Sequence, residues 1–224
     1  MCSVNSQRGP RTVSVLRRLS LSVRKRLPGR VRHALRLGRH LISTGQSSAW
    51  IPARLLADCK MCASRDDLVG LLPRQGRIAE VGTLKGHFAR HILAVSEPAE
   101  LHLVDLDFSS LEPAVAEDVR VQLHNGTSHQ VLMRFPDAYF DWIYIDADHS
   151  YAGVSRDAHA AALKIKPGGY LIFNDFAHMD PFLGAYGVHR AVVDFAIALN
   201  WPFAWFAYEP HALYDVALRR PQSS

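Results

Sequence analysis

Apolar and polar residues alternate along the chain, from Trp50 onward, in a pattern that predicts strands interleaved with helices. Short and nearly continuous apolar runs are typical of strands buried on both faces. Such runs predict seven strands, at residues 77–81, 101–104, 119–123, 142–145, 170–173, 203–208 and 214–218. Apolar positions spaced three and four apart are typical of helices that bury one face. They predict helices over residues 51–72, 85–95, 153–165 and 188–199.

The order of these elements predicts an α/β domain over residues 50–224. Strands that alternate with helices form a mostly parallel sheet, because each helix carries the chain back to the edge where the previous strand began. We therefore expect a Rossmann-like, seven-stranded, mostly parallel sheet with helices on both faces. The last two strands are joined by a short segment that contains Glu209 and Pro210, which predicts an antiparallel C-terminal hairpin.

Residues 1–49 form an arm whose charge differs from that of the rest of the chain. The arm contains ten Arg, one Lys and no acidic residue, whereas the remaining 175 residues carry 15 basic and 21 acidic side chains. The net charge of +5 therefore comes from the arm and does not indicate a nucleic-acid-binding domain. The arm alternates Arg with Leu and Val, which leaves three interpretations open: a helix on an anionic membrane surface, an organelle transit peptide, or a solvated extension.

Two further features bear on the compartment. No apolar run reaches the roughly 18 residues that cross a bilayer, which argues against an integral membrane protein. The three cysteines, Cys2, Cys59 and Cys62, indicate no disulfide framework. We expect Cys59 and Cys62 to be ordinary helix cysteines, since no second Cys or His pair follows at zinc-finger spacing. These features predict a cytoplasmic protein, with membrane association through residues 1–49 left open.

The first predicted strand runs directly into a glycine-containing turn. It reads Glu80-Val-Gly82-Thr83-Leu-Lys-Gly86 and opens a helix. Ligands of open α/β sheets bind at the carboxyl ends of the strands, where Gly82 allows the backbone close to a ligand and Gly86 allows the helix to pack tightly. The dinucleotide motif has a different glycine spacing, and a carboxylate at position 80 suits a cation better than a pyrophosphate. An NAD-dependent oxidoreductase is therefore disfavoured.

The next two strands also end in polar residues. Asp105 follows the second strand, about 20 residues after the glycines, where a carboxylate accepts hydrogen bonds from a ribose diol. We prefer it to Asp107 because it directly follows the apolar run. The third strand leads into the polar turn 125–128, where an adenine would lie, so Ser128 is a further candidate. The cofactor-binding candidates are thus Glu80, Gly82, Thr83, Gly86, Asp105 and Ser128.

At this point the sequence resembles class I methyltransferases that depend on S-adenosylmethionine, and more closely a small bacterial group of glycan and macrolide-sugar O-methyltransferases. The resemblance covers about residues 65–220 and is more specific for fold and cofactor than for substrate. It implies that the glycines of the first strand contact the methionine part of S-adenosyl-L-methionine, and that Asp105 holds its ribose. The segments that carry it are residues 77–89, 100–107, 141–154, 166–175 and 186–195.

The fourth and fifth strands end in groups that suit a metal ion. Asp146 follows the fourth strand, and Asn174 and Asp175 follow the fifth. Neighbouring parallel strands end at the same edge, so these oxygen atoms are candidate ligands for Mg²⁺ or another divalent cation. The spacing resembles that of metal-dependent O-methyltransferases. In the macrolide-sugar enzymes two acids occupy the places of Asn174 and Asp175, so this chain has one negative charge fewer.

His149 lies three residues after Asp146, where the resemblance places a catalytic base. Methyl transfer is an in-line displacement, and a hydroxyl acceptor needs a group that removes its proton. An imidazole has a suitable pKa for this role, with Asp146 as its partner in the catalytic site. The alternative is that His149 only braces the following helix. For Tyr151 and Asp157 we expect structural roles.

The sequence as a whole predicts an O-methyltransferase that acts on a sugar or another small-molecule hydroxyl, with S-adenosyl-L-methionine as cofactor and a divalent cation assisting. Two alternatives stay open: an RNA methyltransferase that uses the basic arm, and a non-catalytic Rossmann-like binding module. The acidic balance of residues 50–224 disfavours nucleic acid as a partner, so the expected acceptor is a small molecule or a glycan. The oligomeric state is open, with a homo-oligomer among the options.

Overall fold

The computed structural model describes residues 49–180 and 184–222. The basic arm predicted at residues 1–49 therefore lies outside the described residues, except for Ala49, and its three interpretations stay predictions. Within the described part of the chain, no helix has the length and apolar character that crossing a membrane would require.

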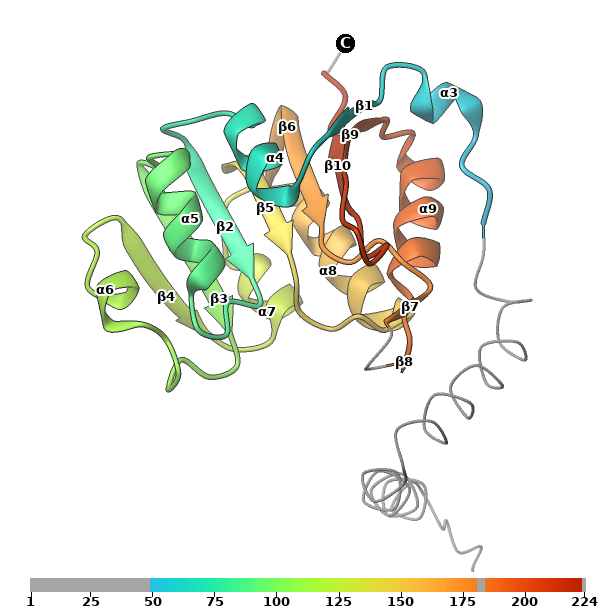
Figure 1. Cartoon of the computed structure of the whole chain (residues 1–224). Helices are drawn as coiled ribbons and strands as arrows, with labels where there is room; N and C mark the ends of the chain where they lie inside the picture. Colours follow the sequence, from blue (N-terminus) through green and yellow to red (C-terminus); the bar gives the residue numbers. More distant parts are fainter. Residues whose placement is uncertain (1–48, 181–183, 223–224) are drawn as a thin grey trace, which may run out of the picture. The chain divides into compact units, whose positions relative to one another are not determined.

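An eight-stranded sheet forms the centre of the domain (Figure 1). Its strands follow the order β1-β9-β10-β6-β5-β2-β3-β4. Only β10 runs antiparallel to its neighbours, β6 and β9, and every other pair in the sheet is parallel. The prediction of a mostly parallel Rossmann-like sheet with a C-terminal hairpin is confirmed, with one more strand than the seven expected. The strands are β1 (Lys60–Cys62), β2 (Arg77–Val81), β3 (Glu100–Asp105), β4 (Val121–Asn125), β5 (Phe140–Ile145), β6 (Ile165–Phe173), β9 (Phe203–Ala207) and β10 (Asp215–Arg219). A separate hairpin pairs β7 (Met179–Asp180) with β8 (Gly184–Ala185).

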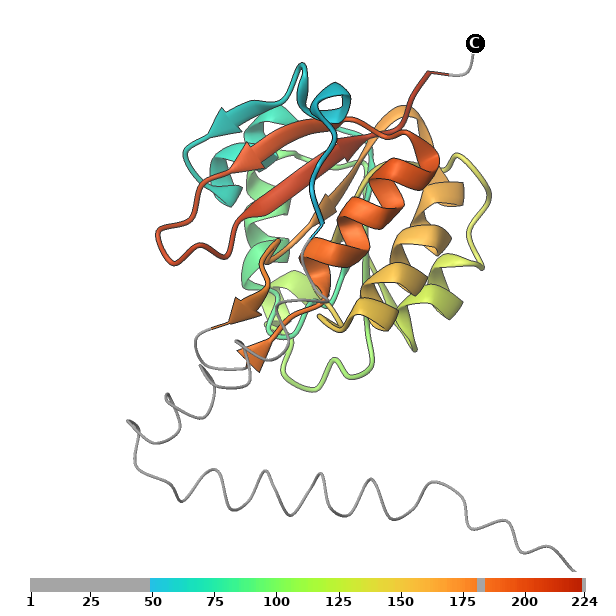
Figure 2. The ribbon, with the colours of Figure 1, turned by 90° about the vertical axis from the view of Figure 1, so that its right-hand side faces the viewer.

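Helices cover both faces of the sheet, as the alternation of strands and helices predicts. One face packs against α7, α8 and α9, which lie side by side in Figure 2, and the other packs against α4 and α5. The helices are α3 (Ala53–Leu56), α4 (Arg65–Leu71), α5 (His87–Val95), α6 (Pro113–Ala116), α7 (Ser128–Leu132), α8 (Tyr151–Lys164) and α9 (Val188–Leu199). The short helices α6 and α7 were not predicted from the sequence.

The central strand β5 shows why the apolar runs of the sequence become strands. Successive side chains of a strand point to opposite faces, so a strand covered on both faces is apolar at every position. Trp142 and Tyr144 pack into the core under α4 and α5, while Ile143 and Ile145 pack into the core under α7–α9. All four are almost completely buried.

The single helix predicted over residues 51–72 is wrong. The structure has two short helices there, α3 and α4, separated by β1, which pairs in parallel with β9. Cys59 and Cys62 are therefore not helix cysteines, and both are free, partly buried thiols. Hydrogen bonding to the edge of the sheet outweighs a weak helical pattern here. The helix α4 begins at the cap residue Ser64, whose hydroxyl accepts from the backbone N–H of Asp67.

A buried histidine pair joins β3 to β4. His102 is only 2% exposed, and its Nδ1 lies 3.0 Å from Nε2 of His124. Its Nε2 lies 3.1 Å from Oε2 of Glu100, which also accepts from the hydroxyl of Tyr139. Burial lowers the pKa of both histidines below their usual value. The folded protein therefore holds this pair uncharged near neutral pH.

We predict that His102 makes the protein less stable as the pH falls below about 6.5, the ordinary histidine pKa. In that range the unfolded chain takes up a proton that the folded chain resists, so the free energy of unfolding decreases. In His102→Gln the decrease between pH 7.5 and pH 5.5 should be smaller than in the wild type, as measured by urea unfolding. His211→Gln, which changes an exposed side chain, serves as the control. An equally steep decrease in His102→Gln would contradict this account.

Candidate functional site

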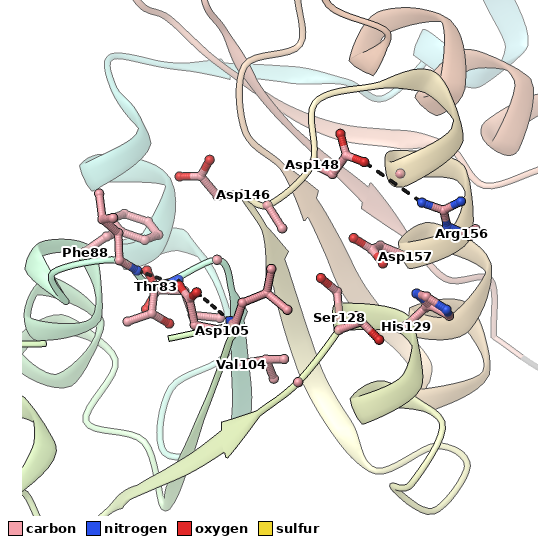
Figure 3. Close-up of a pocket in the computed structure, with 18 of the residues that line it drawn as sticks. Thr83, Phe88, Val104, Asp105, Ser128, His129, Asp146, Asp148, Arg156 and Asp157 are labelled. Atoms are coloured by element: carbon pink, nitrogen blue, oxygen red, sulfur yellow. Dashed lines mark hydrogen bonds and ion pairs between the residues drawn. The ribbon is translucent and has the colours of Figure 1, made fainter. Parts of the chain in front are cut away.

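A pocket of about 670 Å³ opens at the carboxyl ends of β2, β3, β4 and β5 (Figure 3). The turns that follow these strands line it, together with parts of α4, α5 and α8. Five of the six predicted cofactor-binding residues line this pocket: Glu80, Gly82, Thr83, Asp105 and Ser128. The sequence therefore located the pocket through separate strand ends that the fold brings to one edge.

Gly86, the sixth candidate, is not among the lining residues. It precedes α5 with a φ of 80°, and a Cβ atom there would overlap the side chain of Leu111. Its role is therefore the tight packing of the helix, which the sequence also predicted, and not contact with a ligand in this pocket.

Gly82 lies where β2 and β5 approach each other most closely. Its φ is +91°, and a Cβ atom at this position would overlap the backbone carbonyl of Asp146. The amide of Gly82 donates to the carbonyl of Val104, and the amide of Asp146 donates to the carbonyl of Val81. Only glycine fits this turn, because it has no side chain and readily adopts a positive φ.

Asp105 holds the turn after β2 in place. Its Oδ2 accepts hydrogen bonds from the backbone N–H groups of Thr83, at 2.9 Å, and Leu84, at 2.8 Å. Its Oδ1 accepts from the N–H of Leu106 at 2.6 Å. Asp107 instead accepts from Ser109 and does not line the pocket, which favours the choice of Asp105. The N–H of Asp107 also donates to Oδ1, at 3.3 Å, so about four acceptor sites are occupied. A ligand hydroxyl would replace or share this longest of the four hydrogen bonds.

Glu80 places a buried carboxyl group in the wall of the pocket. The residue is 2% exposed, and its Oε2 has no hydrogen-bond partner among the described residues. Burial, and then the nearby carboxylate of Asp146, raises the pKa of Glu80 well above its usual value. A buried carboxylate is costly unless a cation or hydrogen-bond donors compensate it. The site therefore fits a ligand with a positively charged donor, such as the ammonium group of a methionine moiety.

Arg65 is a lining residue that the sequence did not reveal. Its guanidinium group lies over the ring of Phe88, 4.9 Å from the centroid, and its charge lowers the pKa of both Glu80 and Asp146. It comes from α4, inside the segment that was wrongly predicted as one long helix. No local motif marks it, so only the packing of α4 beside the pocket could identify it.

The predicted chemical residues come together around the imidazole of His149. Its Nε2 lies 3.5 Å from Oδ1 of Asp146, 3.5 Å from Oδ2 of Asp175 and 3.3 Å from Oδ1 of Asn174. The ring stacks on Tyr186 with 4.5 Å between centroids. Burial, together with Asp175, raises the pKa of Asp146 to about 8. Asp146 lines the pocket, whereas His149, Asn174 and Asp175 are not among its lining residues, so Asp146 connects the histidine to the ligand space.

The three predicted metal ligands, Asp146, Asn174 and Asp175, surround a nitrogen atom and not a cation-sized space. A Mg²⁺ or Ca²⁺ ion needs oxygen atoms at about 2.0–2.6 Å, and the imidazole of His149 occupies the point that these oxygens share. Across residues 49–180 and 184–222, no group of three or more His, Cys, Asp or Glu side chains is arranged to hold a metal ion. As arranged, the residues do not fit the predicted divalent cation.

Asp215 explains why Asn174 faces the histidine. It lies on β10, is 3% exposed, and accepts from the hydroxyl of Tyr144 at 2.6 Å. The side-chain amide of Asn174 donates to Tyr144 and to Asp215, at 3.1 and 3.2 Å, so its carbonyl oxygen turns toward His149. Burial raises the pKa of Asp215 to about 6. Sequence reasoning missed Asp215 because it is far along the chain, in a strand without a recognisable motif.

We predict that Gly82→Ala weakens cofactor binding. The new Cβ atom would push β2 away from β5 and distort the turn that carries Thr83, so the affinity for S-adenosylhomocysteine should fall at least about tenfold and the thermal unfolding midpoint should fall by several degrees. Calorimetric titration and thermal unfolding measure the two effects. Gly70→Ala is the control, since its Cβ would meet only an ordinary contact with Val95. Wild-type affinity in Gly82→Ala would refute the role assigned to this turn.

Comparison with known proteins gives the fold and a domain match. A family model described as a methyltransferase domain matches residues 79–176, from β2 to just beyond β6. An S-adenosylmethionine-dependent methyltransferase from Mesorhizobium loti has a similar structure, with a TM-score of 0.52 and 15% identity over 69% of this chain and 96% of that chain. One from Methanosarcina mazei has a TM-score of 0.53 and 12% identity, over 70% of this chain and 98% of that chain.

An O-methyltransferase family protein from Burkholderia thailandensis has a TM-score of 0.54 and 12% identity over 71% of this chain, but the match covers only 56% of that longer protein. Comparison with curated proteins gives no match. The glycan and macrolide-sugar subgroup therefore stays a prediction. Residues 79–176 match the methyltransferase domain model, and the chain has the class I fold that enzymes dependent on S-adenosylmethionine also have.

Proposed function

We propose that this protein transfers the methyl group of S-adenosyl-L-methionine to a hydroxyl oxygen of a sugar or another small molecule. The observation that carries the proposal is the imidazole of His149, held between the carboxylates of Asp146 and Asp175 beside the pocket. A base in this position is what an oxygen acceptor requires, because a hydroxyl group is a poor nucleophile until its proton is removed.

The pocket provides matching groups for each part of the cofactor. Glu80 would bind the ammonium group of the methionine moiety, Asp105 the ribose hydroxyls, and the turn at Ser128 the adenine. S-adenosyl-L-methionine supplies an activated methyl group on a positively charged sulfur, and the acidic wall that includes Asp146 favours that charge. Arg65 also lines the pocket, and its positive charge reduces the repulsion between the acidic side chains there.

His149 is suited to remove the proton of the acceptor. The carboxyl groups of Asp146 and Asp175 flank its Nε2 and, in their ionised form, stabilise the imidazolium that forms, while the carbonyl oxygen of Asn174 fixes the orientation of the ring. Stacking on Tyr186 further limits rotation of the imidazole. The same contacts explain how the enzyme would hold the acceptor oxygen near the methyl group, since a positioned base also orients the hydroxyl that it binds.

The assistance by a divalent cation that the sequence predicts has less support than the histidine. The imidazole already provides a positive charge between Asp146 and Asp175 once it is protonated, and its Nε2 lies 3.3–3.5 Å from all three predicted ligand oxygens. We therefore assign deprotonation to His149. An RNA acceptor is disfavoured by the five acidic residues that line the pocket, Glu80, Asp105, Asp146, Asp148 and Asp157.

We predict that Glu80→Gln lowers the affinity for S-adenosylhomocysteine by about tenfold to hundredfold, the loss expected for one charged hydrogen bond. Since the Glu80 pKa is raised in the free protein, an ammonium ligand that favours the ionised carboxylate should release a proton on binding. Calorimetry in two buffers with different ionisation enthalpies should detect this release in the wild type and a smaller release in Glu80→Gln.

Glu117→Gln is the matched control for this experiment, because it makes the same change at an exposed position. It should bind and release protons as the wild type does. A wild-type protein that fails to bind either S-adenosylmethionine or S-adenosylhomocysteine would refute the proposed function. Equal affinities in Glu80→Gln and the wild type would refute only the role of Glu80.

We predict that His149→Ala reduces turnover at least about hundredfold, the usual contribution of a general base, and changes the affinity for S-adenosylhomocysteine by less than about threefold. Turnover is measured as S-adenosylhomocysteine formed with an acceptor that the wild type methylates, found by screening sugars and small hydroxyl compounds. His159→Ala, an exposed histidine on α8, should retain full activity.

Two outcomes would overturn this assignment. If His149→Ala loses cofactor binding and turnover to the same extent, the histidine is structural. If EDTA abolishes wild-type turnover and Mg²⁺ restores it, a metal ion and not the imidazole activates the acceptor.

A further inference from the structure

Asp157, for which the sequence predicts a structural role, is a buried acid in the wall of the pocket. It lies on α8 and is 3% exposed. In Figure 3 it lies together with Ser128 and His129, across the pocket from Thr83 and Asp105. This end of the pocket is the one that the turn after β4 forms, where the proposed function places the adenine.

The helix itself gives no reason for an acid at this position. The N-terminus of α8 is capped by Ser150, whose hydroxyl accepts from the N–H of Gly153, so Asp157 is not a cap. It lies on the face of α8 that also buries Val154, Ala158 and Ala161, where an apolar residue is expected. A carboxyl group on such a face lowers stability unless its partners compensate for the lost hydration.

The neighbours of Asp157 compensate only part of the cost of burying its carboxyl group. Burial raises its pKa to about 6, and His129, Ser128 and Arg156 act in the opposite direction. The guanidinium of Arg156 also lies 4.0 Å from Asp148, an exposed acid at the same pocket, and therefore is shared between the two carboxylates. The arrangement suits a ligand that supplies a further hydrogen-bond donor to Asp157.

Adenine has such a donor on its exposed edge. Its exocyclic amino group offers two N–H groups, whereas hypoxanthine carries a carbonyl oxygen at the same place. The turn after β4 supplies Gly126, Thr127 and Ser128 to this end of the pocket, none of which is an acid. A carboxylate is therefore available from the facing helix alone, and a site built to hydrogen-bond one such group rejects the analogue that lacks it.

We propose that the carboxyl group of Asp157 accepts a hydrogen bond from the adenine amino group of the cofactor, which makes Asp157 the residue that distinguishes adenosyl from inosyl ligands. This inference rests on the proposed function, since it takes S-adenosylmethionine as the ligand. Ser128 and His129 act with Asp157 by holding its carboxyl group toward the pocket.

The test is calorimetric titration of the full chain with S-adenosylhomocysteine and with S-inosylhomocysteine, which differ at that group and at the neighbouring N1, an acceptor in adenine and an N–H donor in hypoxanthine. The wild type should bind the adenosyl form at least about tenfold more tightly, the effect of one hydrogen bond to a charged group. Asp157→Ala should lower this ratio to near one through weaker binding of the adenosyl form. Glu117→Ala, which removes an exposed acid that does not line the pocket, should keep the wild-type ratio.

Asp157→Asn tests the same point in a variant of nearly unchanged volume, should the alanine variant not fold. Its amide can donate to the carbonyl of hypoxanthine and can also accept from the adenine amino group, so the ratio of adenosyl to inosyl affinity should fall toward one. A wild type that binds the two ligands equally, or an Asn variant that keeps the wild-type ratio of affinities, overturns the role of Asp157. A wild type that binds neither ligand overturns the proposed function itself, so the two failures are distinguishable.

Discussion

The contact between the ends of β2 and β5 is the constraint on which the site depends. Gly82 meets the backbone of Asp146 so closely that no side chain fits between them. Because β2 is also paired with β3, the same contact sets Glu80, Asp105 and Asp146 at one edge of the sheet. Three residues that are distant in sequence thus form one wall, and the local conformation of a single glycine maintains it.

An acidic lining is the second feature that shapes the pocket. Buried carboxyl groups with raised pKa values, at Glu80, Asp146 and Asp157, are unfavourable while the pocket holds only water. A ligand with an ammonium group, a sulfonium and an amino-bearing base relieves this cost at several points at once. Under the proposed function, these buried acids lower the stability of the free protein and favour a cationic ligand.

Strong sequence patterns predicted the fold, and local turns predicted most of the pocket. The apolar runs of β2 to β6 are continuous because those strands are covered on both faces, so their ends, with Glu80 and Asp105, could be located by counting. Features set by contacts between distant segments could not be predicted. β1 forms only because β9 offers a partner, and Arg65 and Asp215 reach the site from elements without a motif.

The predicted metal site shows that the spacing of residues along the sequence does not determine ligand geometry. The sequence brought Asp146, Asn174 and Asp175 to adjacent strand ends, which the structure bears out, but ligand geometry depends on side-chain directions that spacing does not contain. The hydrogen bonds from Asn174 to Asp215 and Tyr144 decide that direction, and they turn its oxygen toward His149.

The most direct test of the central claim is a crystal structure of the protein with S-adenosylhomocysteine bound. The account predicts that the ammonium group of the ligand lies within hydrogen-bond distance of Glu80 Oε2, with the ribose at Asp105 and the adenine at the end formed by Ser128 and Asp157. A ligand bound in the reverse direction, or outside this pocket, would contradict it.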